Sequence, residues 1–449
     1  MGDGEPMSER TWAVVGGGML GATLALRLAE GGERVALFES APELGGLASA
    51  WRLGDVLWDR HYHVTLLSDG RTRNLLAELG VESDMRWVVT RTGCYADGKL
   101  YSVSNAHEFL RFPPLRLLDR FRLGWTVLYA SRISDWRRLE DIGVEEWLSR
   151  LSGDRAFGRF WRPLLRSKLG DDYRQASAAF IWAVIQRLYA ARHSGMKTEM
   201  FGYVPGGYAR TLSRLAARLE EAGVELHLGR PVESVGSLGR PFVRHAGGTE
   251  HYDEVVVTVA APIAARLVEG LSAAELDALA SVRYQGIVCA SLLLSRPLSP
   301  FYVTNITDSG FPFTGVIEMT ALVDPADFGG RHLVYLPCYV PSEDELLHVS
   351  DEALRDSLLA GLRRMHPDLE DGHVLAFRVS RERYVLPIPT IGYSRRLPPQ
   401  DTRLPGVHIV NSAHIVNGTL NVNETVQLAE GAAYRLLGSA PPSTLGRPS

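Results

Sequence analysis

The stretch from Thr11 to Glu39 limits the possible folds more than any other part of the chain. A short apolar run at 12–15 leads into a glycine-rich turn, and a helical pattern then leads into a second apolar run at 34–38. The turn reads Gly16-Gly17-Gly18-Met19-Leu20-Gly21. A strand, a GxGxxG turn, a helix and a second strand ending in an acid form the βαβ unit that binds dinucleotides.

The glycines of this turn have definite tasks in such a unit. Gly16 allows the tight turn, Gly18 lets the backbone approach a pyrophosphate, and Gly21 lets the helix pack closely on the strand. The helix N-terminus presents N–H groups and a positive dipole to the phosphates. Glu39, eighteen residues after Gly21, lies where a carboxylate accepts hydrogen bonds from ribose hydroxyls. The sequence therefore predicts a dinucleotide site rather than an ordinary glycine turn.

A second glycine pair narrows the choice of dinucleotide. Residues 40–48 read SAPELGGLA, and Gly45-Gly46 lies six residues after Glu39, so that the chain folds back over a second side of the pyrophosphate. This extension resembles the flavoproteins of the superfamily that contains monoamine oxidase, protoporphyrinogen oxidase, phytoene desaturase and UDP-galactopyranose mutase. The resemblance implies that the dinucleotide is FAD rather than NAD.

Later motifs extend the resemblance over about residues 11–438. A Gly206-Gly207 turn, a buried strand at 252–260 and a last strand and helix at 406–437 follow in the order expected of these flavoproteins. Most relatives have Gly-Asp where this chain has Asn411-Ser412. The cofactor-binding residues that the motifs and the resemblance imply are Gly16, Gly18, Met19, Leu20, Gly21, Glu39, Ser40, Gly45, Gly46, Leu47, Ala48, His61, Val232, Ala260, Asn411, Ser412, Asn421, Val422 and Asn423.

The fold class expected from this pattern is α/β: a Rossmann-type FAD-binding domain with an inserted α+β substrate-capping domain. The FAD-binding domain is expected to be discontinuous, and the insertions to form a helical cap and the sheet of a substrate domain. The expected boundaries are 11–70, 196–270 and 386–438 for the FAD-binding domain, 71–195 for the cap, 271–385 for the sheet, and 1–10 and 439–449 for polar tails.

Candidate catalytic residues follow the second glycine pair. His61 and His63 lie in WDRHYH, a segment that runs past the flavin ring in the resembled family. Histidine titrates near neutrality, so either residue could act as a general base or bind flavin or substrate. On a strand, residues i and i+2 also face one side, which leaves simple packing as the alternative. Tyr384 is the third catalytic candidate, because an aromatic residue often lines the substrate pocket there in the family.

Further polar residues are candidates for holding the substrate, together with Tyr384. Arg162 and Arg166 share one face of a predicted cap helix with Arg159, and clustered guanidinium groups suit a diphosphate or carboxylates. A solvated basic face is the alternative. Glu318 lies on a predicted strand of the substrate domain, where a catalytic role and a pairing role both remain open.

Composition excludes several other classes of protein. A net charge of −4 gives no nucleic-acid footprint. Three scattered cysteines predict neither a disulfide framework nor a metal site, which favours a reducing compartment and a cytoplasmic protein. No run reaches the roughly 18 apolar residues of a membrane span. The amphipathic segment 115–133 either packs into the cap or rests on a membrane surface. Whether the protein forms a homo-oligomer is left open by the sequence.

The resemblance implies an FAD-dependent oxidoreductase. A small organic substrate under the cap would lose a hydride from a C–H next to C or N, and O2 or another acceptor would reoxidise the flavin. Monoamine and polyamine oxidases carry a lysine on the strand that corresponds to 286–290, where this chain has none, which favours protoporphyrinogen oxidase or desaturase types. The alternatives are a redox-neutral mutase that acts on a nucleotide sugar and a structural or sensing role for FAD.

Overall fold

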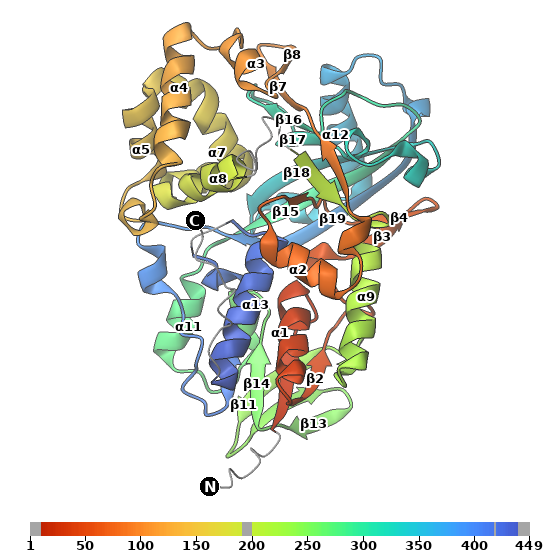
Figure 1. Ribbon diagram of the computed structural model, residues 1–449, viewed down its shortest axis with the longest axis vertical. Helices are drawn as coiled ribbons and strands as arrows, with labels where there is room; N and C mark the ends of the chain where they lie inside the picture. The colour runs from red at the N-terminus through yellow and green to blue at the C-terminus, as the bar shows by residue number, and fades with distance from the viewer. Residues whose placement is uncertain (1–9, 191–199, 417–418, 439–449) are drawn as a thin grey trace.

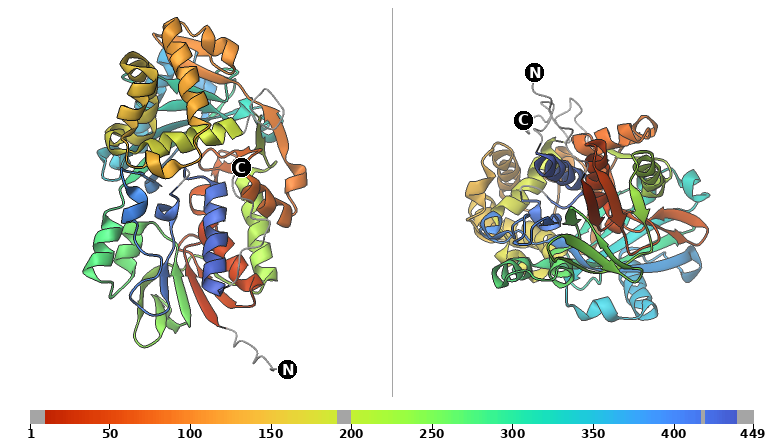
Figure 2. Two further views of the ribbon diagram at one scale, coloured as in Figure 1. Left: turned by 60° about the vertical axis from the view of Figure 1, so that its left-hand side comes forward. Right: turned by 90° about the horizontal axis from the view of Figure 1, so that it is seen from below.

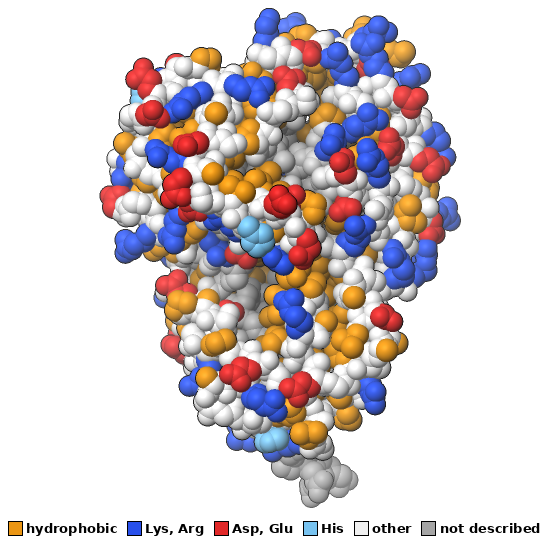
Figure 3. Space-filling view, turned by 180° about the vertical axis from the view of Figure 1, so that it is seen from behind, with side chains coloured by type: hydrophobic (Ala, Val, Ile, Leu, Met, Phe, Trp, Pro, Cys, Tyr) orange, Lys and Arg blue, Asp and Glu red, His pale blue; other side chains and the backbone are white. Residues whose placement is uncertain are grey.

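The computed structural model describes residues 10–190, 200–416 and 419–438. The chain forms two stacked lobes, with the N-terminal βαβ unit in the lower lobe and the predicted cap in the upper one (Figure 1). The view from behind shows basic and acidic side chains interspersed over both lobes, in keeping with the small net charge (Figure 3).

A parallel sheet forms the centre of the lower lobe. Its strand order is β10-β2-β1-β14-β20, and every neighbouring pair is parallel. Since helices and a second sheet cover both faces, its strands are apolar runs rather than alternating ones. Their bounds are Thr11–Val15 for β1, Arg34–Phe38 for β2, Glu225–His227 for β10, Glu254–Val257 for β14 and Val407–Ile409 for β20.

Three helices cover one face of this sheet, and a small meander covers the other (Figures 1 and 2). The helices are α1 (Met19–Glu30), α9 (Gly207–Glu221) and α13 (Val422–Leu437). The meander consists of β11 (Val232–Ser237), β12 (Pro241–His245) and β13 (Gly248–His251), followed after β14 by α10 (Ala261–Leu267) and α11 (Ala273–Ala280).

A seven-stranded sheet forms the floor of the upper lobe, in the order β19-β15-β18-β17-β16-β7-β8. All residues of β15, which lies between β19 and β18, are buried, and α12 packs on one face of the sheet. The bounds are Thr92–Ala96 for β7, Lys99–Ser102 for β8, Tyr284–Leu294 for β15, Val303–Ile306 for β16, Gly315–Glu318 for β17, His332–Pro341 for β18, Val374–Pro387 for β19 and Asp351–Met365 for α12.

A helical layer lies beside this sheet (Figure 2). Trp147, Phe157 and Tyr173 are almost fully buried in its core. A short π-helical turn, Phe157–Trp161, runs directly into α7. The helices are α3 (Ala106–Leu110), α4 (Leu117–Ala130), α5 (Val144–Ser152), α6 (Asp154–Ala156), α7 (Arg162–Leu169) and α8 (Ala178–Ala190).

The segment 71–195 differs from the helical cap expected from the sequence. β7 and β8 add two strands to the upper sheet, and β6 (Arg86–Val89) pairs with β9 (Met200–Tyr203), which in turn pairs with β5 (Thr65–Leu66). The first helix, α2 (Gly70–Glu78), buries its leucines in the core of the lower lobe beside α13. The helical part therefore begins only at α3, because the preceding apolar residues complete the nucleotide-binding core and the substrate sheet.

Some expectations fall outside the described residues. These are the tails, except for Arg10, residues 191–199 at the expected boundary between the cap and the FAD-binding domain, and residues 417–418 of the expected last segment. The expected strand 252–260 is shorter, as β14 runs only from Glu254 to Val257.

Candidate functional site

The carboxyl edge of the lower sheet gathers most of the residues predicted to bind the cofactor. The ends of β1, β2, β14 and β20 lie in register, so that Val15 is beside Phe38 and Val257, and Val257 is beside Ile409. The loops that follow carry Gly16–Gly18, Glu39, Ala260 and Asn411 to this edge. Open α/β sheets bind their ligands in such a crevice, where the strand order reverses.

The two glycine loops touch each other at this edge. Gly45 N donates to Gly17 O at 2.9 Å, and Gly18 and Gly45 form an isolated parallel bridge. A Cβ on Gly46 would lie 3.2 Å from Gly18 Cα, whereas a Cβ on Gly18 would meet nothing closer than Gly46 Cα at 4.0 Å. The space beside Gly18 is thus open, as a phosphate close to bare backbone requires.

The N-terminus of α1 has no side-chain cap. Its N-cap is Gly18 and its first turn contains no acid, so its N–H groups and dipole face the opening. Glu39 is fixed beside it, because its carboxylate accepts from Gly17 N at 2.6 Å and from Ala41 N at 2.8 Å. Carboxylate oxygens have several acceptor sites, so Glu39 keeps capacity for ribose hydroxyls. Ser40 donates to the same carboxylate at 3.0 Å.

Asn411 supplies a test of whether this crevice fits a flavin nucleotide. Its side chain is fully buried and accepts from Ala413 N through Oδ1. Its Nδ2 has no hydrogen-bond partner in the part of the chain that the structure describes. A buried amide donor without a partner costs about 1–3 kcal/mol, and FAD offers acceptors in its pyrophosphate and flavin ring. The residues at the carboxyl edge therefore fit FAD.

The remaining predicted cofactor residues fall into two groups. Asn421 caps α13 by accepting from Glu424 N at 3.1 Å, and this helix begins at Val422 on the opening side of the lobe. Asn423 uses its side-chain oxygen to accept from Arg71 N and Thr72 N, so its amide holds α2 in place. Ser412 Oγ lies 3.3 Å from the hydroxyl of Tyr284. Ala260 is the N-cap residue of α10, and Val232 is the first residue of β11.

His61 joins the second glycine loop to the upper sheet. Its Nδ1 lies 3.2 Å from Leu47 O, and its Nε2 lies 3.0 Å from Ser380 Oγ on β19. Next to it, Arg60 contacts Gly46 O at 3.3 Å and pairs with Glu382 at 2.6 Å. Burial lowers the pKa of His61 to about 3, so the ring is neutral at pH 7. With both ring nitrogens engaged, this geometry favours positioning over general-base chemistry.

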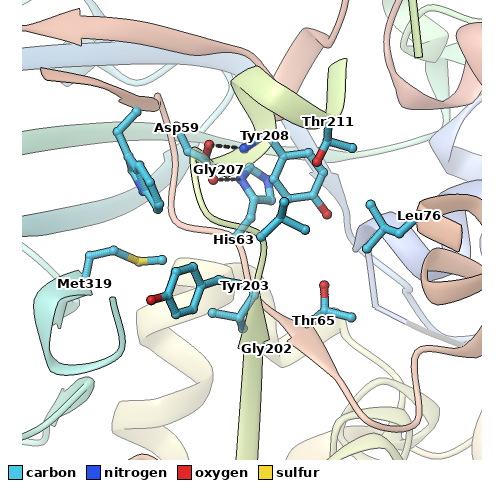
Figure 4. A pocket seen from close by; sticks show the side chains of 13 residues that line it. Asp59, His63, Thr65, Leu76, Gly202, Tyr203, Gly207, Tyr208, Thr211 and Met319 are labelled. Carbon is cyan, nitrogen blue, oxygen red and sulfur yellow. Dashed lines mark hydrogen bonds and ion pairs between the residues drawn. The ribbon is translucent and has the colours of Figure 1, made fainter. Parts of the chain in front are cut away.

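His63 lies beside a small cavity with Asp59 (Figure 4). Its Nδ1 is 4.0 Å from Asp59 Oδ2, its ring centroid is 5.0 Å from that of Tyr208, and Asp59 Oδ1 accepts from Tyr208 N at 2.7 Å. Burial raises the pKa of Asp59 to about 7 and lowers the pKa of His63 to about 4. The cavity has about 20 Å³ of room for water, enough for one molecule, and Thr65 contributes to its lining.

A lysine and two tyrosines meet on the other side of this segment. Lys168 Nζ, from α7, donates to Tyr62 OH at 3.2 Å and to Tyr339 OH at 3.1 Å, and the two hydroxyls are 3.0 Å apart. Lys168 Nζ also lies 4.5 Å from the Tyr339 ring centroid. Gln285 of β15 fixes the end of α7 by donating to Leu169 O at 2.7 Å. The sequence groups Lys168 only with the arginines of its helix and does not indicate its contact with Tyr62 and Tyr339, because the three residues come from separate segments.

The predicted substrate residues are not brought together. Arg162 pairs with Glu145 at 3.4 Å and Arg166 with Asp171 at 3.1 Å, all four side chains being exposed. At about 100° per residue, Arg166 lies on the opposite face of α7 from Lys168. The solvated basic face is therefore what the structure shows for both arginines in these pairs.

Glu318 and Tyr384 also lie in structural surroundings. Glu318 is buried and accepts from Leu298 N at 2.8 Å and from Ser299 N at 2.7 Å, so it holds a turn rather than facing the crevice. Burial raises its pKa to about 7. Tyr384 is partly buried and packs edge-on against Tyr284 with ring centroids 5.7 Å apart, in the cluster around β14.

Comparisons with known proteins agree with this geometry. Residues 21–437 match the model of the family described as flavin containing amine oxidoreductase. A coproporphyrinogen III oxidase of Mycobacterium tuberculosis is 28% identical over 296 residues, which cover 59% of this chain and 62% of that protein. The chain thus spans less than two thirds of this relative. A 15-cis-phytoene desaturase of Narcissus pseudonarcissus is 35% identical over 126 residues, covering 27% of this chain and 21% of that protein.

The fold is also found in a solved structure of reduced UDP-galactopyranose mutase. The TM-score is 0.75 at 16% sequence identity, with 97% of each chain covered. The Rossmann-type fold predicted from the sequence is confirmed. The family match confirms the resemblance and the class of a flavin-containing oxidoreductase. The chain belongs to the family of flavin-containing amine oxidoreductases, and its cofactor is FAD.

Proposed function

We propose that the protein oxidises a small organic substrate at a C–H bond next to carbon or nitrogen. Bound FAD supplies the acceptor for a hydride, and O2 or another oxidant takes up the two electrons afterwards. The substrate gives up a hydride and a proton and gains a C=C or C=N bond. Relatives named as an oxidase and a desaturase support this class of reaction.

The observation that carries the proposal is the cluster of Tyr62, Tyr339 and Lys168. Its Tyr62 directly follows His61, and His61 contacts the second glycine loop. A substrate held by the cluster would therefore lie next to the flavin. Within the described residues, this cluster brings a cation and two phenols to the segment that the resemblance places beside the flavin. An oxygen of the substrate, such as a carboxylate or carbonyl, would accept from Lys168 and a tyrosine. We assign these three residues to substrate binding.

In this reaction, His63 and Asp59 would hold and relay the proton that the substrate releases. Neutral His63 donates through Nδ1 to His61 O at 3.0 Å, so only its Nε2 can accept a proton. Asp59, with a pKa of about 7, can hold a proton at 4.0 Å from Nδ1. Their cavity has room for a water molecule that could relay the proton released by the substrate. His61 would act as a positioning residue for the second glycine loop and β19.

The redox-neutral mutase reading finds less support in these contacts. A nucleotide sugar brings a diphosphate with two negative charges, for which Arg162 and Arg166 were the candidate ligands. Both arginines are instead paired with exposed carboxylates. Lys168 alone offers one charge, which suits a single carboxylate or carbonyl better.

The test is anaerobic mixing of the purified, oxidised holoenzyme with pools of amines, porphyrinogens, isoprenoids and nucleotide sugars, while the absorbance of oxidised flavin is recorded. Bleaching by an amine, porphyrinogen or isoprenoid pool is the expected result. Product formation from a nucleotide sugar only after reduction with dithionite, without net consumption of electrons, would overturn the proposal in favour of a mutase.

We also propose a reducing compartment, the cytoplasm, as the site of action. Cys94 and Cys289 are buried, Cys338 is partly buried, and none of the three forms a disulfide. Burial raises the pKa of Cys94 to about 12, which keeps its thiol protonated and unreactive. Thiol titration of denatured protein taken directly from cells should find three reduced cysteines; fewer would contradict this assignment.

A further inference from the structure

Helix α4 of the upper lobe exposes an apolar face. Its exposed large side chains are Leu117 (59%), Leu118 (61%), Phe121 (59%), Trp125 (59%) and Tyr129 (42%). At about 100° per residue, these five positions fall within about 120° of the helix circumference. Such a contiguous aromatic and aliphatic strip on the surface marks an interaction site rather than scattered exposure. We call these five residues the α4 strip.

The opposite face of α4 already has a partner. Leu123, Thr126 and Ala130 are buried against the core of the helical layer, and Trp182 of α8 donates to Ile133 O at the end of the helix. The segment 115–133 therefore packs into the cap through one side, which is one of the two alternatives left open by the sequence, and leaves the other side exposed. Packing on its buried side fixes α4, so the strip is presented on a rigid support.

Basic side chains surround the α4 strip. Residues 110–132 contain five arginines and a single acid, Asp119. Asp119 is buried and lies 3.4 Å from Arg155, so it does not offset the arginines at the surface. Arg111, Arg116, Arg122 and Arg132 are all exposed.

We propose that the α4 strip docks on an anionic lipid surface. Leu and Phe enter the acyl boundary, Trp and Tyr suit the headgroup level, and arginines reach the phosphates while their stems cover apolar surface. A second copy of the chain fits less well, because a twofold contact would bring the same arginines face to face. No helix within the described residues has the length and apolarity to cross a bilayer. The contact would therefore be peripheral.

The experiment is sedimentation of the full-length holoenzyme with vesicles. Vesicles of phosphatidylglycerol and phosphatidylcholine should bind the protein, and vesicles of phosphatidylcholine alone should bind it more weakly. Added salt should weaken binding to the anionic vesicles. The double variant Arg116→Gln/Arg122→Gln should weaken it by about fivefold per arginine.

The decisive variant is Phe121→Glu/Trp125→Glu, which should lose most of the bound fraction. Its matched control is Leu238→Glu, since Leu238 is 81% exposed and directly follows β11 in the lower lobe, whereas α4 belongs to the upper lobe (Figure 1). Unchanged FAD content and unfolding temperature in all variants would show that they fold. The proposal would be overturned if the wild-type protein did not bind anionic vesicles, or if Phe121→Glu/Trp125→Glu bound them as well as wild type.

A third outcome would also overturn it. If light scattering shows a dimer whose mass falls with dilution, and Phe121→Glu/Trp125→Glu yields a monomer, then the α4 strip is an interface between copies. This test measures vesicle binding and mass, so its result does not depend on the substrate proposed above.

Discussion

The imidazole of His61 hydrogen-bonds to Leu47 O through Nδ1 at 3.2 Å and lies 3.0 Å from Ser380 Oγ through Nε2. Since a carbonyl oxygen only accepts, Nδ1 carries the hydrogen and Nε2 accepts from the serine hydroxyl. One ring thus links the second glycine loop in the lower lobe to β19 in the upper lobe.

The first prediction concerns this link. His61→Ala should lower FAD content and turnover together, because it leaves Leu47 O and Ser380 Oγ without their shared partner. A buried polar group without a hydrogen-bond partner lowers the free energy of unfolding by about 1–3 kcal/mol. Ser380→Ala is the matched variant, since it breaks half of the link and should give a smaller loss of the same kind. The measurements are flavin absorbance per protein and turnover. A His61→Ala enzyme with full FAD content and slow flavin reduction would instead make His61 catalytic.

Substitutions of Gly18 and Gly21, two glycines of the GxGxxG motif, should separate effects on FAD binding from effects on folding. Gly18 has φ −67°, and a methyl group on it would meet only Gly46 Cα at 4.0 Å, so Gly18→Ala should fold but bind FAD weakly. A Cβ on Gly21 would lie 1.9 Å from Gly16 O, so Gly21→Ala should lower the unfolding temperature of the apoprotein itself. Gly18→Asp should abolish FAD binding by repelling the pyrophosphate, and a fully yellow variant would contradict the assignment.

The cofactor crevice could be predicted from the sequence because its residues follow regular elements. Gly16 and Glu39 each come directly after a parallel strand, and the carboxyl ends of such strands meet at one edge. Asn411 and Asn421 were found in the same way, as residues between a strand and a helix.

The substrate side could not be predicted in the same way. Tyr62, Lys168 and Tyr339 come from a loop, a helix end and a long strand, and only the packing of α7 on the upper sheet brings them together. Arg166 and Lys168 lie on opposite faces of α7, and spacing alone does not show which of these two exposed basic residues contacts the tyrosines. For Glu318, the sequence leaves a catalytic role and a pairing role open, because it does not show that two backbone N–H groups donate to the carboxylate.

The tyrosine and lysine cluster gives the next prediction. Lys168→Met should raise the KM of the substrate by about tenfold with a smaller change in kcat, because a hydrogen bond to a charged group contributes about 1.5–3 kcal/mol. Arg166→Met, on the opposite face of α7, is the matched control and should behave as wild type. Steady-state kinetics with the compound that bleaches the flavin in the anaerobic test measures both. Equal effects of the two variants would argue against the cluster as a binding site.

Glu318 should be structural. In Glu318→Gln one of the two backbone donors, Leu298 N or Ser299 N, faces an amide NH2 and loses its acceptor. The free energy of unfolding should fall by about 1–3 kcal/mol, with FAD content and KM unchanged. Denaturant unfolding of the holoenzyme measures the loss. A variant with normal stability and a raised KM would restore the substrate role considered from the sequence.

The pH dependence of stability should have opposite signs for Asp59 and His63. Burial raises the pKa of Asp59 from 3.8 to about 7, so the folded protein holds a proton that the unfolded chain releases, and stability is lost as pH rises through this window. Burial lowers the pKa of His63 from 6.5 to about 4, so the unfolded chain binds the extra proton, and stability is lost as pH falls through that window.

Single substitutions should separate these two contributions. The stability of Asp59→Asn relative to wild type should increase from about pH 4 to pH 7 and then level off, since the variant has no carboxyl to ionise. The stability of His63→Gln relative to wild type should increase as pH falls from 6.5 to about 4. Denaturant unfolding at several pH values, with FAD saturating throughout, measures both differences. Parallel pH profiles for the two variants would mean that neither group is buried as the cavity beside Tyr208 requires, and would remove the proton-holding pair from the proposed mechanism.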